Sequence, residues 1–318
     1  MAIPKYSIVI PVYNRPLEID ELLMSLTLQT FTNFEVIVIE DGSTINSNEV
    51  VANYTTQLNI SYYVKPNSGP GPSRNFGFEK ANGDYFVVFD SDCIIPPTYL
   101  GTVDNFLQLS PLDVWGGPDK GSADFTPIQQ AMAYTMSSIF TTGGIRGGKS
   151  KGFQPRSFNM GMSKDVFKNT GGFLLDRFAE DIEFSIRVKK MGLKVSLIPQ
   201  AFVYHKRRTD FTQFFNQVSN FGKGRVQVGR VHPNAIRAAH WFPALILFGL
   251  LSIPILFFIH TYVAQLGMLV YAIYFSLIAI HAFATTESIE VSLLSIPSAF
   301  IQLTGYGYGF LKEIMRRQ

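Results

Sequence analysis

The fold that we predict depends on one stretch, Tyr85-Phe86-Val87-Val88-Phe89-Asp90-Ser91-Asp92. Its five apolar residues are aromatic or β-branched, a pattern typical of a strand buried on both faces of a parallel sheet. Asp90 and Asp92 follow where this strand ends. Ligands bind outside the carboxyl ends of parallel strands, so the acidic pair suits a divalent cation that bridges protein and phosphate. The alternative is a solvated turn with two acids, and the surrounding sequence has to decide.

The first 90 residues alternate between strand and helix patterns. This predicts successive β-α units, a largely parallel sheet and an α/β fold of the nucleotide-binding kind. The predicted strands are 6–12, 34–39, 60–64 and 85–89, and the predicted helices are 16–29 and 73–81. Asn14, Asp41 and the Asp90/Asp92 pair each follow a strand. Their side chains can therefore converge on one edge of the sheet, which favours a functional role for the acidic pair.

A later helix pattern, 178–191, has Glu180 and Asp181 in its first turn, where the helix dipole favours carboxylates. The run 141–152 is rich in Gly, Lys and Ser, and it predicts a mobile loop. Short strands are predicted at 113–117, 157–162, 194–198 and 202–204. The α/β pattern therefore extends, less regularly, to about residue 204.

Composition separates the last third of the chain from the rest. Hydrophobic residues make up 47% of the 318 residues and charged residues 16%, which is charge-poor for a soluble protein. The segment 241–310 has no Lys, Arg or Asp, and its acids are Glu287 and Glu290. The only cysteine is Cys93, which excludes an intramolecular disulfide and fits a reducing cytosol. The N-terminus enters a strand pattern directly, so we expect no cleavable signal peptide.

Two apolar segments, 241–259 and 262–284, are each long enough to cross a hydrocarbon core of about 30 Å. Before them, 205–240 is basic and interleaved with Phe, which predicts an amphipathic helix on an anionic membrane surface. A nucleic-acid-binding face has a similar composition, but the apolar segments favour the membrane, and we expect no nucleic acid partner. A weaker segment, 291–310, leads to a basic tail. The positive-inside rule favours a re-entrant or interfacial segment there over a third span.

Six motifs, spread over about residues 6–195, resemble the inverting glycosyltransferases of family 2, which use nucleotide sugars and have the fold called GT-A. They are YSIVIPVYNRP (6–16), EDGS (40–43), SRNFG (73–77), DYFVVFDSD (84–92), NTGGF (169–173) and EDIEFSIRVKKMG (180–192). The later runs VYHKRR, FGKGR and GYGYGFL are similar to the membrane-attached branch that acts in bacterial exopolysaccharide and glycolipid synthesis. The Q-x-x-R-W motif of processive synthases is absent, which argues for one sugar per acceptor.

The resemblance implies a metal-dependent donor site. Asp92 would bind Mg²⁺ or Mn²⁺ directly, and Asp90 would assist as a further ligand or hold the ribose. His205 would be another ligand, although it could equally cap a strand. Asp41 would take the base or the ribose, and Arg74 would lie near the base unless it is an ordinary surface arginine. The implied donor-binding residues are Pro11, Tyr13, Asn14, Asp41, Arg74, Asp90, Ser91, Arg207 and Arg208.

The same resemblance implies the catalytic residues. Asp181 would be the general base that takes the proton of the acceptor hydroxyl opposite the leaving group, so that inversion follows. Its place in the first turn of a helix favours the ionised form that a base requires. Glu180 would orient Asp181 or the acceptor. The alternative is that these acids only compensate the helix dipole.

These implications predict a GT-A catalytic domain at 1–204, a basic interfacial region at 205–240 and a membrane domain at 241–318. The expected enzyme is a hexosyltransferase with a nucleotide-sugar donor, UDP being favoured on family prevalence, and a lipid-linked or saccharide acceptor. We expect a multi-pass protein of the inner (plasma) membrane whose catalytic domain is cytoplasmic. The rivals are a transferase that makes a sugar-phosphate lipid from a polyprenyl phosphate, and a non-catalytic membrane scaffold. A glycosidase would need neither nucleotide nor metal.

Overall fold

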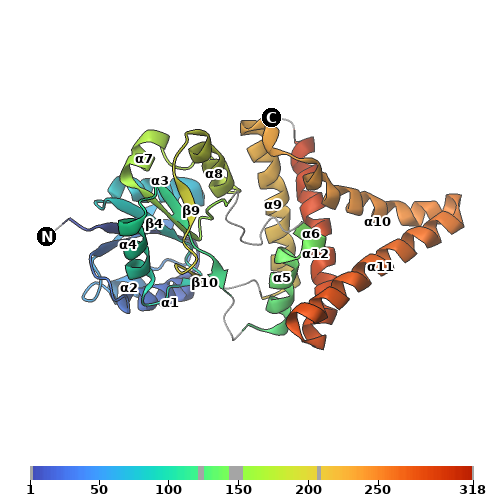
Figure 1. The fold of residues 1–318 in the computed structure, drawn as a ribbon, viewed down its shortest axis with the longest axis horizontal. Coiled ribbons are helices and arrows are strands. Elements are labelled where there is room, and N and C mark those ends of the chain that lie inside the picture. The colour runs from blue at the N-terminus through green and yellow to red at the C-terminus, as the bar shows by residue number, and fades with distance from the viewer. Residues whose placement is uncertain (1–2, 121–124, 143–152, 206–208, 317–318) are drawn as a thin grey trace. The chain divides into compact units, whose positions relative to one another are not determined.

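The computed structural model describes residues 3–120, 125–142, 153–205 and 209–316 (Figure 1). The chain forms two compact units. The first, here called the sheet unit, comprises 1–122 and 149–206, and the second, the helical unit, comprises 123–148 and 207–318. The predicted loop at 141–152 lies for the most part outside the described residues. The predicted catalytic domain at 1–204 differs from this division, because 123–148 belongs to the helical unit.

The sheet unit is built on a seven-stranded sheet in the order β3-β2-β1-β4-β8-β6-β9. Its strands are β1 (Tyr6–Val12), β2 (Phe34–Asp41), β3 (Ile60–Lys65), β4 (Tyr85–Phe89), β6 (Val114–Gly116), β8 (Asn159–Ser163) and β9 (Val195–Leu197). The pairs β1–β2, β1–β4, β2–β3 and β6–β9 are parallel, whereas β8 runs antiparallel to β4 and β6. The predicted α/β fold is confirmed, with β8 as the exception to a parallel sheet.

A second, three-stranded sheet has the order β5-β10-β7 and consists of β5 (Cys93–Ile94), β10 (Val203–His205) and β7 (Asp119–Lys120). Because β10 pairs with β5, His205 lies opposite Cys93 and next to Asp92 in the fold. The helices of this unit are α1 (Pro16–Thr27), α2 (Asn48–Ala52), α3 (Pro70–Lys80), α4 (Tyr99–Leu109), α7 (Lys164–Thr170) and α8 (Glu180–Lys190). The three-stranded sheet thus places β10, the last strand of the sheet unit, beside the residues that follow β4.

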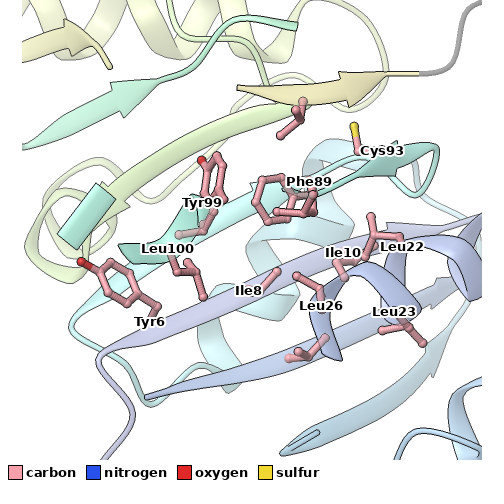
Figure 2. Close-up of a cluster of buried hydrophobic side chains, with 14 of the residues drawn as sticks. Tyr6, Ile8, Ile10, Leu22, Leu23, Leu26, Phe89, Cys93, Tyr99 and Leu100 are labelled. Carbon is pink, nitrogen blue, oxygen red and sulfur yellow. The ribbon is translucent and has the colours of Figure 1, made fainter. Parts of the chain in front are cut away.

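Side chains on both faces of the large sheet are buried. Ile8 and Ile10 of β1 pack with Leu22 and Leu26 of α1 on one face (Figure 2). Val9 belongs to the cluster on the other face, which includes Phe78, Phe86, Met160 and Phe184. Burial on both sides explains why β4 is apolar throughout rather than alternating. The parallel register then brings the carboxyl ends of β1, β2 and β4 to one edge, as predicted.

The described part of the helical unit contains short helices that the sequence patterns missed. Its helices are α5 (Pro127–Ser137), α6 (Ile139–Thr142), α9 (Phe211–Val231), η1 (Pro233–Ala235), η2 (Ala238–Trp241), α10 (Phe242–Ile259), α11 (Thr261–Thr286) and α12 (Ile289–Met315). The longest of the missed helices is α5, whose Met132 and Met136 pack with Phe214 and Val218 of α9. These contacts, together with those of Tyr134 with α11 and α12, explain why α5 groups with the C-terminal helices.

Helices α9 and α12 pack closely because glycines line their contact. A Cβ atom on Gly222 would lie 2.2 Å from the Tyr306 carbonyl oxygen, and one on Gly309 would lie 2.0 Å from that of Ser219. One face of α9 is therefore covered by protein, and the membrane-surface location predicted for 205–240 stays a prediction. The segment 291–310 belongs to one continuous helix, α12, which is not among the described helices that are apolar enough to cross a membrane, and its predicted relation to a membrane stays a prediction.

Helices α10 and α11 form an apolar hairpin, in which the Tyr271 hydroxyl donates to the Ile246 carbonyl at 2.9 Å. By length and composition, Ala238–Ile259 and Thr261–Thr286 could each cross a membrane, with mean hydropathies of 2.5 and 2.0. Phe258 and Tyr262, beside the turn of the hairpin, are 92% and 79% exposed. Such large exposed apolar side chains favour contact with lipid over water.

Candidate active site

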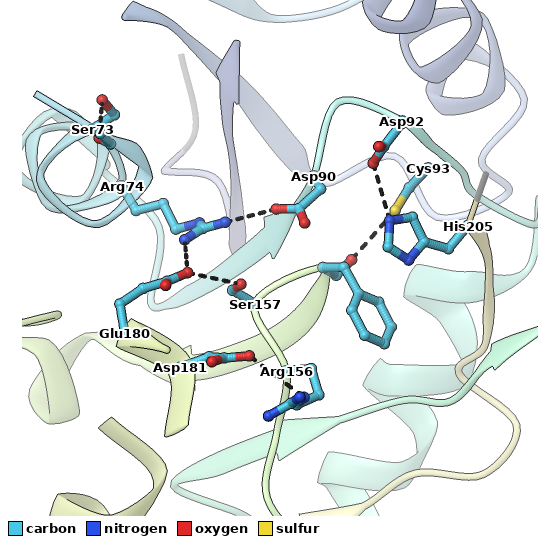
Figure 3. Close-up of polar contacts among 12 residues, drawn as sticks. Ser73, Arg74, Asp90, Asp92, Cys93, Arg156, Ser157, Glu180, Asp181 and His205 are labelled. Atoms are coloured by element: carbon cyan, nitrogen blue, oxygen red, sulfur yellow. Dashed lines mark hydrogen bonds and ion pairs between the residues drawn. The ribbon is translucent and has the colours of Figure 1, made fainter. Parts of the chain in front are cut away.

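Asp92 lies at the edge of the sheet where β4 ends, and two cationic or basic groups hold its carboxylate. His205 Nε2 lies 3.1 Å from Asp92 Oδ1 (Figure 3). Arg15, which follows β1, forms an ion pair with Asp92 Oδ2. The Asp92 residue is 5% exposed, so its charge requires these partners. The structure therefore brings together Asp92 and His205, as predicted, and adds Arg15.

The donor atoms at Asp92 fit a hard divalent cation. Neighbouring ligands of an octahedral ion with bonds of about 2.1 Å lie about 3 Å apart, close to the 3.1 Å between Asp92 and His205. The Cys93 sulfur completes a group whose ligand atoms lie within 4.8 Å of one another. Burial, reinforced by Asp92 and Asp90, raises the pKa of the Cys93 thiol, which donates to the Phe158 carbonyl at 3.6 Å. Of these three atoms, the oxygen and nitrogen donors suit a hard divalent cation better than the sulfur does.

Arg74 is buried at the centre of a second cluster. Its Nη1 lies 2.6 Å from Glu180 Oε1 and its Nη2 2.6 Å from Asp90 Oδ1, so it bridges the two acids (Figure 3). Only 2% of Arg74 is exposed, and the alternative of an ordinary surface arginine is wrong. Asp90 remains 33% exposed and is paired with Arg74 rather than with His205. One fixed guanidinium thus pairs with two neighbouring acidic groups.

Glu180 and Asp181 begin α8 but have different surroundings. Burial raises the pKa of Glu180 to about 6; the nearby Arg74 opposes this shift, and Asp181 adds to it. Ser157 also donates to Glu180 Oε1 at 3.2 Å. The side chain of Asp181 is 14% exposed, with Arg156 Nε 3.6 Å away. Glu180 is therefore a buried partner of Arg74, whereas Asp181 is the more accessible acid.

The backbone just before these acids is unusual. Ala179 caps α8 with φ 58° and ψ 25°, the left-handed region that a residue with a Cβ rarely adopts. Such conformations cost roughly 1–3 kcal/mol and occur most often at functional sites. The turn places Glu180 and Asp181 in the first turn of the helix, where their charges oppose the positive end of the helix dipole.

Asp41 ends β2 and holds the loop before α3. Its carboxylate accepts from the Ser68 amide at 2.9 Å, from the Gly69 amide at 2.8 Å and from Lys65 Nζ at 2.8 Å. Burial raises the pKa of Asp41, but these donors outweigh burial and the net pKa is lowered. Asp41 is thus an ionised anchor of the loop, and its predicted contact with the base or ribose is still a prediction.

The remaining predicted residues are placed as follows. Asn14 has φ 52°, and its side-chain oxygen accepts from the Thr44 and Ile45 amides, so it joins the turns after β1 and β2. Tyr13 is 50% exposed and is available for stacking. Pro11 is paired with Ile39 inside the sheet, and Ser91 is buried. Arg207 and Arg208 lie outside the described residues.

The sequence reasoning missed Arg15, Arg156 and Ser157 as members of the site. Arg15 stands inside the quoted motif YSIVIPVYNRP, so its place after a strand was a usable signal. Arg156 and Ser157 lie in an irregular segment before β8, where no spacing pattern points to Asp181 or Glu180. Their positions depend on how the chain returns to the sheet, which a local pattern does not encode.

Two protein-family models match the chain. The one described as Glycosyl transferase family 2 matches residues 7–171, more than half of the chain, and the one described as Glycosyl transferase family 21 matches residues 126–303. The first match contains Arg15, Asp41, Arg74 and the Asp90/Asp92 pair. It ends before Asp181 and His205, so their roles depend on the geometry given above.

Curated relatives with sequence similarity are glycosyltransferases. "Uncharacterized glycosyltransferase RC0461" of Rickettsia conorii is 42% identical over 88 residues, which cover 28% of this chain and 15% of that protein. Glycosyltransferase AglE of Haloferax volcanii is 24% identical over 257 residues, which cover 79% of this chain and 83% of AglE. The chain therefore matches only a small part of the first relative but most of AglE.

Solved structures share the fold. Mannosyltransferase PcManGT of Pyrobaculum calidifontis, in complex with GDP-Man and Mn²⁺, has a TM-score of 0.63 over 98% of this chain and 87% of its own, at 14% identity. Staphylococcus aureus TarS 1-349 has a TM-score of 0.50 over 70% of this chain and 65% of its own, at 25% identity. The predicted GT-A fold is thereby confirmed.

Proposed function

The chain belongs to glycosyl transferase family 2, and from this premise we propose that it transfers a sugar from a nucleotide sugar to a membrane-associated acceptor, with inversion and with the help of a divalent cation. One arrangement supports this proposal best. Asp90 lies between a candidate cation site at Asp92 and His205 and the Arg74–Glu180 pair that begins the Asp181 helix (Figure 3). The candidate cation site and the candidate base thus lie close to one another at one edge of the sheet.

Asp92 and His205 would hold Mg²⁺ or Mn²⁺, and Asp90 would serve as a further ligand or would hold the ribose. When bound, the ion supplies positive charge that stabilises the departing diphosphate. PcManGT, which shares the fold, was solved in complex with Mn²⁺, and this supports the choice of ion. Arg74 would fix Asp90 in place, because its guanidinium is held from the other side by Glu180.

Asp181 would accept the proton of the acceptor hydroxyl on the side opposite the diphosphate, which inverts the anomeric carbon. Its greater exposure compared with Glu180 supports this assignment, because a base has to reach the acceptor. Glu180 would position Arg74 rather than take a proton. Arg156 Nε, 3.6 Å from Asp181 Oδ2, would help to hold that carboxylate in position.

Tyr13 and Asp41 would contact the nucleoside, with Pro11, Asn14 and Ser91 shaping the pocket. Tyr13 has half of its surface exposed for stacking on a base. TarS has been solved with UDP-GlcNAc and PcManGT with GDP-Man, so UDP and GDP sugars are the donors to test first. We favour a UDP sugar.

The acceptor would be lipid-linked and the protein a multi-pass protein of the inner membrane with a cytoplasmic sheet unit. The exposed apolar hairpin of α10 and α11 supports this part of the proposal. Arg207 and Arg208, which follow His205 in sequence, would bind a pyrophosphate of the donor or of the lipid.

The donor half of the proposal is tested by calorimetry on the purified full chain in detergent, with UDP and GDP sugars in the presence and absence of Mn²⁺. We expect metal-dependent binding of one donor class and its loss in Asp92→Asn. Lys168→Gln is the matched control, because its side chain is 61% exposed and pairs with Asp165 on the surface. Binding of neither class by the native chain would contradict an enzymatic function.

The acceptor half is tested by incubating the chain and its preferred donor with a membrane lipid extract, followed by mass spectrometry of the products. We expect a lipid heavier by one sugar residue. A product with the sugar on a polyprenyl monophosphate identifies the rival transferase, and a product found only on water-soluble saccharides contradicts the lipid-linked acceptor.

A further inference from the structure

We propose that Arg15 couples the binding of the divalent cation to the binding of the nucleoside diphosphate. Its guanidinium pairs with Oδ2 of Asp92, while His205 faces Oδ1 of the same carboxylate. When a diphosphate arrives with the cation, Arg15 exchanges the carboxylate for a phosphate oxygen. This inference rests on the proposed function, because it assigns both ligands to the same site.

The carboxylate of Asp92 is engaged on both oxygens. Oδ1 faces His205 Nε2 at 3.1 Å, and Oδ2 is paired with Arg15. A divalent cation that binds Asp92 alone would meet the positive charge of Arg15 beside it, in a setting where Asp92 is 5% exposed and water screens poorly. The cation alone therefore has to compete with Arg15, and its affinity is reduced.

Arg15 is placed to move between two partners. Its carbonyl accepts from the Ile19 amide at 3.1 Å, so its backbone is fixed at the start of α1. Its side chain, in contrast, is 29% exposed, whereas that of Arg74 is 3% exposed and is held by Asp90 and Glu180 at the same time. Arg74 is thus a fixed bridge between two acids, and Arg15 is a guanidinium with room to turn.

A diphosphate can replace the Asp92 carboxylate as the partner of Arg15. The planar guanidinium matches the oxygens of a phosphate group as well as those of a carboxylate. The residue lies at the N-terminal end of α1, where the helix dipole also favours an anion. The nucleotide would therefore release Asp92 for the cation, and the cation would favour the nucleotide to the same degree, because coupling between two binding sites is reciprocal.

The test is a titration of Mn²⁺ into the full chain in detergent, followed by electron paramagnetic resonance of the free ion, with and without UDP or GDP. We expect the better nucleotide to tighten Mn²⁺ binding by about tenfold or more in the native chain, within the usual range of coupling between sites. In Arg15→Gln, Mn²⁺ alone should bind at least about threefold tighter, and the effect of the nucleotide should shrink by a similar factor. Arg15→Lys should keep part of the coupling, and Lys168→Gln should behave as native.

The outcomes separate this inference from the proposed function. If the native chain binds Mn²⁺ with neither nucleotide, the proposed function fails. If Mn²⁺ and nucleotide bind with coupling that Arg15→Gln leaves unchanged, the role of Arg15 is overturned while the function stands. Weaker binding of Mn²⁺ alone to Arg15→Gln also overturns it, because Arg15 would then support the cation site. Circular dichroism of the variant, compared with the native chain, shows that the fold is retained.

Discussion

The two units of the chain differ in where their charged and apolar side chains lie. The sheet unit buries charged side chains in pairs, such as Arg74 with Glu180, and covers its apolar residues on both faces of the sheet. The helical unit has Glu313 as the buried charged residue of its described part, and it leaves most of the α10–α11 hairpin uncovered. The first arrangement suits chemistry in a dry polar site, and the second suits contact with hydrocarbon.

The difference teaches that one chain can be apolar for two reasons. In the sheet unit, apolar residues form the core on both faces of the large sheet. In the helical unit, they face outward from a core that is itself held together by close contact of α9 and α12. Variants in one unit should therefore leave the property of the other unchanged, and each prediction below checks this separation.

The largest effect is expected from Asp181→Asn in the sheet unit. Removal of a general base lowers turnover by about 10²–10⁴-fold, while nucleotide binding and membrane association should stay as in the native chain. Steady-state kinetics with the preferred donor and acceptor measures the effect. A variant that retains near-native turnover removes Asp181 from the mechanism.

A second variant, Arg74→Met, tests the buried ion pairs. It leaves Glu180 and Asp90 without their shared partner, and loss of one member of a buried pair costs about 3–5 kcal/mol. Thermal unfolding of the sheet unit, followed by intrinsic fluorescence, should shift to lower temperature. Arg156→Gln is the matched control, because its partner lies 3.6 Å away and its side chain is 28% exposed. Equal shifts in both variants would argue against a special role for burial.

A pair of glycine variants tests the helical unit. In Gly309→Ala the new Cβ would lie 2.0 Å from the Ser219 carbonyl oxygen, whereas in Gly267→Ala the nearest atom is 3.7 Å away. We expect Gly309→Ala to destabilise the unit by about 1–3 kcal/mol, and Gly267→Ala to be neutral or stabilising by up to about 1 kcal/mol. The measurement is thermal unfolding in detergent, with nucleotide affinity as a readout that neither variant should change. Loss of nucleotide binding in Gly309→Ala would break the proposed separation.

The smallest expected effect is the contribution of Asp41 to stability at acidic pH. Burial acts to raise its pKa, but its hydrogen bonds lower the net value below the ordinary 3.8. The unfolded chain therefore binds a proton more readily than the native chain, and the stabilising contribution is present above pH 3.8 and is lost as the pH falls below it. The free energy of unfolding of the native chain should fall as the pH falls below 3.8. In Asp41→Asn, this free energy should depend less on pH. An unchanged acid profile in the variant would show that Asp41 is not the responsible group.

Much of the sheet unit could be predicted because its strands are long, apolar runs that end in polar residues. The strand and its burial are indicated by Phe86 and Val88, and Asp90 marks the end of the strand where the candidate site lies. The direction of β8 could not be read from Asn159–Ser163, because a buried strand has the same apolar composition whichever way it runs. The partners Arg15–Asp92 and Arg74–Glu180 were missed for a related reason, since side-chain pairing depends on non-local geometry.

In the helical unit, the two apolar helices could be predicted from the length of their segments. The packing partners of the other helices could not be predicted from the sequence. The apolar segments at 241–259 and 262–284 correspond to α10 and α11. The helix α5 has a polar first half, with Gln129 and Gln130, and its role becomes visible only in its contacts with α9. The basic composition of 205–240 predicts a membrane surface, which stays a prediction, whereas the packing of α9 on the glycines of α12 depends on contacts that composition does not encode.

Cys93 has a practical consequence for mapping the orientation of the chain. It is the only thiol in the sequence, it is 1% exposed, and burial raises its pKa, so alkylating reagents in water meet an unreactive sulfur. A cysteine introduced at an exposed position, such as Thr261→Cys at the turn of the hairpin or Lys312→Cys in α12, becomes the sole reactive group. Each such variant reports which side of a bilayer one position faces, on an otherwise native background.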